Sequence, residues 1–244
     1  RALRLPLTPG VSNVEVRWQE PRGIAWRYAS PAVDLGTPSV NARTEIHLPR
    51  DRWLLFVSGP TVGPAVLFWG VVIVLIIVAA GIARVPGSPL RAWQWALLGL
   101  GLTQESLFVS ALIVAWFFAL ALRERVADAL SDTRWRFNLV QVALVALTLV
   151  AGVALYYAVR HGLLGTPEMQ VAGNNSTHNR LDWYQDRAGN ILPSPSIVSA
   201  SILVYRALML AWALWLAYSL LKWARWAWLA FSKRGLWRKL ALTL

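Results

Sequence analysis

Long apolar runs constrain this chain more than any other feature of its sequence. Residues 62–83 and 137–159 contain no charged side chain, and residues 197–221 contain only Arg206. About 20 apolar residues are enough for a helix to cross the roughly 30 Å hydrocarbon layer of a bilayer. The composition, 57% hydrophobic and 15% charged, is also more apolar and less charged than that of soluble domains. We therefore predict a mainly α-helical integral membrane protein.

A fourth apolar stretch, residues 92–122, is interrupted near its middle. Glycines at 99 and 101 are followed by Thr103, Gln104, Glu105 and Ser106. One alternative is an interfacial piece at 92–102 followed by a fourth span at 103–122. The other is a re-entrant helical hairpin, and the polar break fits it, since irregular backbone at membrane depth needs protein or a cavity around it. We favour the hairpin because the β-rich region expected before the first span is more typical of the bacterial periplasm than of the cytoplasm. The helical membrane domain is thus expected over residues 59–221, with three or four spanning helices.

Lysine and arginine residues indicate the orientation. Residues 123–136 hold four arginines, and residues 222–244 hold six cations and no acid, so both are assigned to the cytoplasm. The polar loop 160–196, with three arginines over its length, then lies outside. The hairpin alternative puts residues 1–58 outside as well, whereas four spans put them inside. Arg50 and Arg52, just before the first span, favour the inside location.

The region before the first span has the alternation of β-strands. Apolar and polar residues alternate over 3–7, 14–18, 24–28 and most clearly 40–48. Since a β-sandwich needs close to 100 residues and the chain begins with Arg1, we expect part of a sandwich in the C-terminal piece of a longer protein. Such a module beside membrane helices, with 21 Arg against 3 Lys, suggests a bacterial inner-membrane protein with residues 1–58 in the periplasm.

The C-terminal tail, residues 222–244, interleaves basic and aromatic side chains. We expect an amphipathic helix lying in the headgroup plane, with each cation worth about 1 kcal/mol against anionic lipid. A surplus of charge next to an apolar span differs from the basic stripe of a nucleic-acid-binding face, so no nucleic-acid partner is predicted. The expected anchoring residues are Lys222, Trp223, Arg225, Trp226, Trp228, Lys233, Arg234, Trp237, Arg238 and Lys239.

Arg206 and Glu105 are the candidate functional pair. A charge near mid-bilayer costs about 2.5–3.5 kcal/mol, so Arg206 should either extend to the outer headgroups or pair with Glu105, the only acid in the apolar runs, with Gln104 beside it. The same polar break could instead line an ion or proton path, although one acid does not make a relay.

Signs of catalysis are few. The chain has no Cys and no phosphate loop, H-E-x-x-H, nucleophile elbow or dinucleotide motif. Loop 160–196 carries His178, Asp182 and Asp186 at a spacing that matches no metal motif, and residues 183–192 predict a short hairpin. We predict no catalytic residue, metal or cofactor, and lean against an enzyme.

These observations favour an interaction role. We expect an anchoring and assembly domain of a larger membrane protein, binding anionic lipid and other membrane or periplasmic subunits. Small residues in the spans, among them Ala79, Gly81 and Gly152, suit helix contacts. The alternative is a channel or transporter subunit that uses the break at 99–106 and Arg206. A third hypothesis is a lipid- or glycan-modifying enzyme with its site on loop 160–196.

Overall fold

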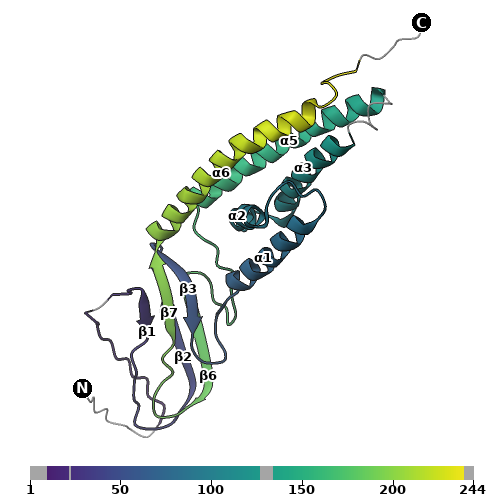
Figure 1. The fold of residues 1–244 in the computed structure, drawn as a ribbon. Coiled ribbons are helices and arrows are strands. Elements are labelled where there is room, and N and C mark those ends of the chain that lie inside the picture. The colour runs from purple at the N-terminus through teal and green to yellow at the C-terminus, as the bar shows by residue number, and fades with distance from the viewer. Residues whose placement is uncertain (1–9, 22, 127–133, 239–244) are drawn as a thin grey trace.

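The chain forms a bundle of helices with short antiparallel strands gathered at one end (Figure 1). The computed structural model describes residues 10–21, 23–126 and 134–238. In this part of the chain the mainly helical class with a small antiparallel β segment is confirmed. The helices are α1 (Phe68–Arg84), α2 (Ala92–Leu102), α3 (Leu107–Arg125), α5 (Arg134–Leu164) and α6 (Ile202–Ser232).

Three of these helices are long and apolar enough to cross a membrane, namely α3, α5 and α6. The first predicted span differs, because α1 has only 17 residues, about 26 Å at 1.5 Å per residue. Residues 62–83 and 197–221 both begin in strands rather than helix. Backbone groups there bond to neighbouring strands, so the helices start later, at Phe68 and Ile202.

The strands come from both sides of the helical region in sequence and pair with one another. Strand β2 pairs antiparallel with β6 from Ser39↔Ala188 to His47↔Arg180, β7 lies between β1 and β3, and β4 pairs with β5. The predicted hairpin at 183–192 is therefore wrong, because β6 has β2 as its partner. The strands are β1 (Arg27–Ala29), β2 (Ser39–His47), β3 (Arg52–Ser58), β4 (Ala65–Val66), β5 (Val171–Ala172), β6 (Arg180–Ala188) and β7 (Ser196–Ser201).

We call residues 27–66 together with 171–201 the β module. Loop 160–196 is thus not a separate loop, since most of it belongs to this module. The strand expected at 40–48 is confirmed as β2, and that expected at 24–28 is reduced to β1. Residues 14–18 are exposed and form no strand, because no neighbouring strand among the described residues pairs with their alternating apolar and polar residues. Residues 3–7 lie outside the described part of the chain.

Trp183 fills the centre of the β module. It is almost completely buried and packs with apolar side chains of β2, β3 and β7. A Cβ atom at either Gly59 or Gly63 would overlap its indole ring. The chain that leads from β3 into β4 therefore passes directly over this ring, which ties the sheets together just before α1.

The helical core is built around α2 and aromatic side chains. Trp95 and Leu98 of α2 are buried, and the Trp95 ring lies 5.4 Å from that of Phe117 in α3. Phe117 in turn lies 5.0 Å from Trp223 of α6. Helix α2 therefore packs against the other helices of the bundle through these buried side chains.

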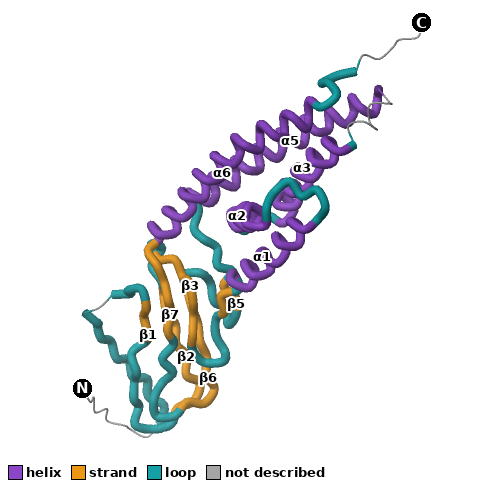
Figure 2. Tube along the Cα trace, viewed as in Figure 1, coloured by secondary structure: helices purple, strands orange, loops and turns teal. Residues whose placement is uncertain are grey.

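Residues 103–106, the turn between α2 and α3, which we call the hairpin tip, lie toward the β module, because the backbone N–H of Glu168 donates to Gln104. At the opposite end, Arg125 Nη1 donates a hydrogen bond of 3.0 Å to the carbonyl oxygen of Pro86. Helix α2 itself packs mainly on α1 and is seen end-on in Figure 2. We call the end with the β module the sheet end and the opposite end the far end (Figure 2). The 11 residues of α2 cover about 16 Å, roughly half of the hydrocarbon thickness of a bilayer.

Candidate functional site

The tip of the hairpin carries Glu105, the acid singled out in the sequence. Its carboxylate lies 3.0 Å from Nδ1 of His161 in the last turn of α5. The neighbouring Gln104 accepts a hydrogen bond of 3.1 Å from the backbone N–H of Glu168. These polar side chains therefore fasten the hairpin tip to the segment that leads from α5 into the β module.

Arg206 is not brought to Glu105 in the described structure. It lies in the second turn of α6 and is exposed. Because α6 begins at Ile202 rather than at 197, the guanidinium is close to the start of the helix, where a long side chain reaches polar surroundings. The position fits the alternative in which Arg206 extends outward, and Glu105 has His161 as its partner instead.

The two glycines of the break are places of close helix packing. A Cβ atom at Gly99 would lie 3.0 Å from Cδ1 of Leu75, and one at Gly101 would overlap the ring of Trp212. Trp212 also donates a hydrogen bond of 2.8 Å from Nε1 to the carbonyl oxygen of Leu97. The glycines thus let α1 and α6 approach α2, which is a packing role.

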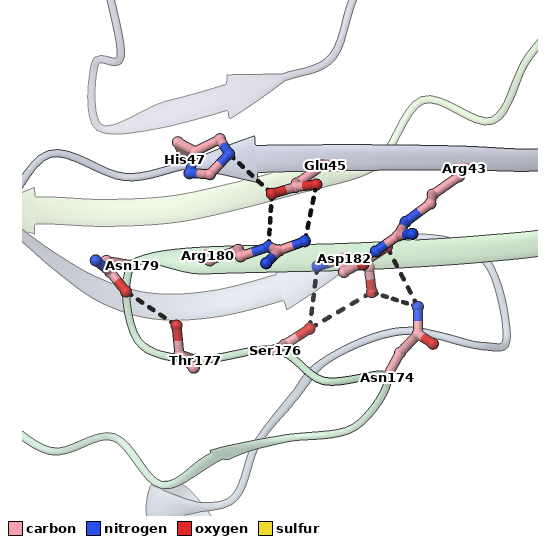
Figure 3. A network of polar contacts seen from close by, with 9 residues as sticks. All are labelled: Arg43, Glu45, His47, Asn174, Ser176, Thr177, Asn179, Arg180 and Asp182. Carbon is pink, nitrogen blue, oxygen red and sulfur yellow. Dashed lines mark hydrogen bonds and ion pairs between the residues drawn. The ribbon is translucent and has the colours of Figure 1, made fainter.

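A polar network joins β2, β6 and the turn before β6 (Figure 3). The buried Asp182 carboxylate accepts hydrogen bonds from both Nε and Nη2 of Arg43. Asn174 Nδ2 lies 3.0 Å from the carbonyl oxygen of Asp182, and Ser176 Oγ accepts from its backbone N–H at 3.0 Å. The backbone of Asp182 therefore holds the turn 173–179, and its carboxylate binds Arg43 of β2.

More exposed charges on the same face of these strands form a second group. Glu45 lies 2.6 Å from Nε of Arg180 and 2.8 Å from Nε2 of His47.

The hydrogen bond to Asp182 and the charge of that carboxylate raise the pKa of Arg43 above its usual value. Arg43 therefore stays charged throughout the ordinary pH range, and the stability that its pair with Asp182 contributes is lost only as the pH rises through the raised pKa.

The three candidate metal ligands on loop 160–196 have different surroundings in the structure. Asp182 is used in the network, Asp186 is exposed, and His178 lines a cavity at the edge of the β module. Across residues 10–21, 23–126 and 134–238, no group of three or more His, Asp or Glu side chains could hold a metal ion.

The basic aromatic tail differs from the expected separate helix. Helix α6 continues without a break through Ser232, so residues 222–232 follow its axis, and Trp223 is buried in the helical core. Trp226 Nε1 donates to Glu124 Oε2 at 3.1 Å. Of the other expected anchoring residues, Arg238 is half-buried and Lys239 lies outside the described part of the chain. The remaining ones are exposed, namely Lys222, Arg225, Trp228, Lys233, Arg234 and Trp237.

Beyond α6, residues 233–238 are held by side chains that the sequence analysis missed. We call Arg123, Asn138 and Gln141 the far-end clamp. Gln141 Nε2 donates to the carbonyl oxygens of Phe231 and Leu236 at 3.1 and 3.2 Å. Asn138 exchanges two hydrogen bonds with the backbone of Arg238, of 2.9 and 3.0 Å.

Arg123 completes this clamp although its side chain is only 2% exposed. Its Nη2 donates to the carbonyl oxygen of Lys233 at 3.0 Å, and its guanidinium lies 4.8 Å from the ring centre of Phe137. Asn138 and Gln141 are three residues apart at the start of an apolar run, hence on one helix face. That spacing is the sequence signal that could have identified them.

Comparison with protein-family models, with curated proteins and with solved structures finds no match for this chain. The function must therefore be argued from the geometry of its own residues.

Proposed function

We propose that this chain is the membrane-embedded anchoring and assembly domain of a larger bacterial inner-membrane protein, with its β module in the periplasm. The observation that carries the proposal is the direct passage from strand to helix. Strand β7 ends at Ser201 and α6 begins at Ile202, whose N–H donates to the carbonyl oxygen of Asp51 at 2.8 Å. Since no linker intervenes, the β module is held rigidly by the helices, as an anchor requires.

The strand pairing supports one of the two predicted topologies. If the long helices cross a bilayer, four spans would separate residues 1–58 from 160–196, but β2 and β6 form a continuous ladder. The hairpin arrangement keeps both regions on one side. It also agrees with the contact between Pro86 and Arg125, which joins both outer ends of the hairpin at the far end.

The packed break favours an anchor over a channel. A conducting path would need polar, water-accessible groups continuing from Glu105 into the bundle, whereas Gly99 and Gly101 lie against Leu75 and Trp212. Glu105 itself is engaged with His161 at the hairpin tip.

Assembly is supported by an apolar groove between α3, α5 and α6. It has a volume of about 660 Å³ and is lined by Gly152, Ala224 and Ala227 among larger side chains. A Cβ atom at Gly152 would meet nothing within 4 Å. Small residues on facing helices let another helix approach closely, so the proposed occupant is a transmembrane helix of a partner subunit.

Cysteine labelling tests the membrane placement, and the chain has no native Cys to interfere. Single cysteines at Val40 and Ile191 in the β module and at Val85 and Leu236 at the far end replace exposed side chains. We expect an impermeant maleimide to label Val40→Cys and Ile191→Cys from the periplasm, and Val85→Cys and Leu236→Cys only after the membrane is opened. Labelling of all four from one side, or extraction of the protein by alkaline carbonate, would refute the proposal.

Leucine substitutions at two glycines test the groove, since at both positions the space around an added Cβ atom is free of other described atoms within 4 Å. Gly152→Leu fills the groove, whereas Gly81→Leu adds the same side chain on α1, where a Cβ atom also meets nothing within 4 Å. We expect only Gly152→Leu to reduce the size of the assembly on a native gel. Equal behaviour of the two variants would remove the groove from the assembly surface.

A further inference from the structure

A second cavity lies where the β module meets the helices. It has a volume of about 250 Å³ and lies between the β2–β3 turn, the segment after α5, the turn before β6 and the first residue of α6. Its walls are formed by Pro49, Arg50, Arg52, Trp53, Leu54, Thr166, Pro167, Met169, His178, Asn179 and Ile202. The cavity therefore lies between strands and turns of the β module, the segment after α5 and the start of α6.

The lining of this cavity is basic. Two arginines and His178 contribute to it, and none of its lining residues is acidic. The Nη2 of Arg52 is held by the carbonyl oxygens of Ala25 and Ser199, whereas its Nε is buried without a hydrogen-bond partner among the described residues. For Arg50, no hydrogen bond or ion pair with another described residue is recorded. Buried polar atoms are normally satisfied, so the buried Nε of Arg52, with the exposed Arg50 lining the same cavity, indicates an anionic ligand.

The place of the cavity in the fold restricts the kind of anion. Helix α5 ends at Leu164 and α6 begins at Ile202, so the cavity lies level with the sheet-side ends of both helices. In a bilayer this is the level of the lipid headgroups. Apolar Trp53 and Ile202 line the cavity beside the arginines, a combination suited to a phosphate that carries an acyl-chain-bearing group.

We infer that this cavity binds the phosphate group of an anionic phospholipid in the leaflet next to the β module, with Arg50 as the principal cation and Arg52 and His178 beside it. This inference rests on the proposed membrane placement. It also gives Arg50 and Arg52 a role on the periplasmic side, where their charge otherwise argues against the topology. The two arginines are ligand-binding groups in this view, and not an orientation signal.

Native mass spectrometry of the full chain, purified in a nonionic detergent, tests the inference. The probes are phosphatidylglycerol, phosphatidylcholine and inorganic phosphate. Arg50→Gln removes a charged donor to phosphate and is expected to weaken phosphatidylglycerol binding about tenfold. Arg50→Lys should retain part of it, because the charge remains but the planar fork is lost.

Two arginines outside the cavity serve as matched controls. Arg187→Gln changes an exposed residue of β6, and Arg225→Gln changes an exposed residue in the last third of α6. Equal binding by wild type, Arg50→Gln and Arg187→Gln would overturn the inference. If Arg225→Gln alone reduced binding, the tail would be the lipid site and the anchoring proposal would stand without the cavity.

The phosphate arm identifies the source of the anion. Persistence of bound phosphatidylglycerol in excess inorganic phosphate supports a lipid ligand. Complete displacement by inorganic phosphate, lost in Arg50→Gln, would overturn the lipid assignment and leave a site for a small soluble phosphate. Failure of the membrane placement would be recognised separately, by the cysteine labelling pattern.

Discussion

The two ends of the bundle hold distant chain segments together in different ways. At the sheet end, β2 and β6 lie side by side through a backbone ladder, and the Arg43–Asp182 pair adds to it. At the far end, residues 233–238 are not a strand, and the side chains of Asn138 and Gln141 bind the backbone of Arg238 and Leu236 directly. The position of the irregular segment thus depends on hydrogen bonds from a few amide side chains. The position of the paired strand depends on many backbone hydrogen bonds.

The largest effect is expected at the sheet end, from Asp182→Ala. This change removes the charged hydrogen bonds to Arg43 and the 3.4 Å hydrogen bond from Nδ2 of Asn174 to the carboxylate, whereas the bond from the backbone N–H of residue 182 to Ser176 remains. A loss of about 3 kcal/mol in unfolding free energy is expected, or about 6–12 °C in the midpoint of thermal unfolding in detergent. Asp182→Asn, which keeps the shape, should lose less. Equal midpoints for wild type and Asp182→Ala would show that the ladder alone holds β6.

The next effect is expected at the far end, from Gln141→Leu. Nε2 of Gln141 lies within hydrogen-bond distance of three backbone carbonyl oxygens, those of Phe231, Gly235 and Leu236, and Oε1 accepts a 3.4 Å hydrogen bond from Nε of the buried Arg123. An apolar replacement leaves these groups unsatisfied, so we expect a loss of about 2 kcal/mol. Faster hydrogen exchange should be confined to residues 233–238, with β2 and β6 unchanged. Spread of the change to the sheet end would contradict the independence of the two ends.

Asn138→Ala should have a smaller effect at the same end. Its two hydrogen bonds to Arg238 lie near the end of the described chain, where the released groups can reach solvent or headgroups. We expect a loss of about 1 kcal/mol, measured as increased protease cleavage after Lys233 or Arg234. Cleavage that is no faster than in wild type would remove Asn138 from the far-end clamp.

The smallest effect is expected for Glu45→Gln. Glu45 pairs with Arg180 and His47 on the solvent side of β2 and β6, and exposed pairs contribute about 0.2–1 kcal/mol. The midpoint of thermal unfolding should fall by no more than a few degrees, and less still in high salt. A fall as large as that of Asp182→Ala would mean that the outer charges, and not the buried acid, hold the two strands together.

Local patterns predicted the elements better than their partners. The apolar runs identify α3, α5 and α6, and alternation identifies β2, because each pattern reflects burial along one element. The same runs misplace the starts of α1 and α6, since Ala65 and Ser196–Ser201 are apolar or small enough for either state and pair with distant strands. Pairing of β2 with β6 depends on long-range contacts that no local period encodes.

The polar residues illustrate the same limit. The sequence marks Glu105 as unusual because it is an acid within an apolar run. It does not indicate the partner, since His161 lies in α5 and not in the helix that carries Arg206. Arg123 was counted only as a charge that sets orientation, although it is buried among Gln141, Phe137 and the backbone of Lys233. A count of charges carries no information on which side chains the fold encloses.

The length of α6 has a consequence for depth in a membrane. Its 31 residues extend about 46 Å, close to the 40–45 Å of a bilayer with its headgroup layers and well beyond the hydrocarbon alone. In the proposed placement, Arg206 and Lys222 would stand about 24 Å apart along the helix axis, one near each boundary of the hydrocarbon. The two cations would then fix the depth of α6 in the bilayer, and because β7 leads directly into α6, they would also fix the height of the β module above the lipid surface.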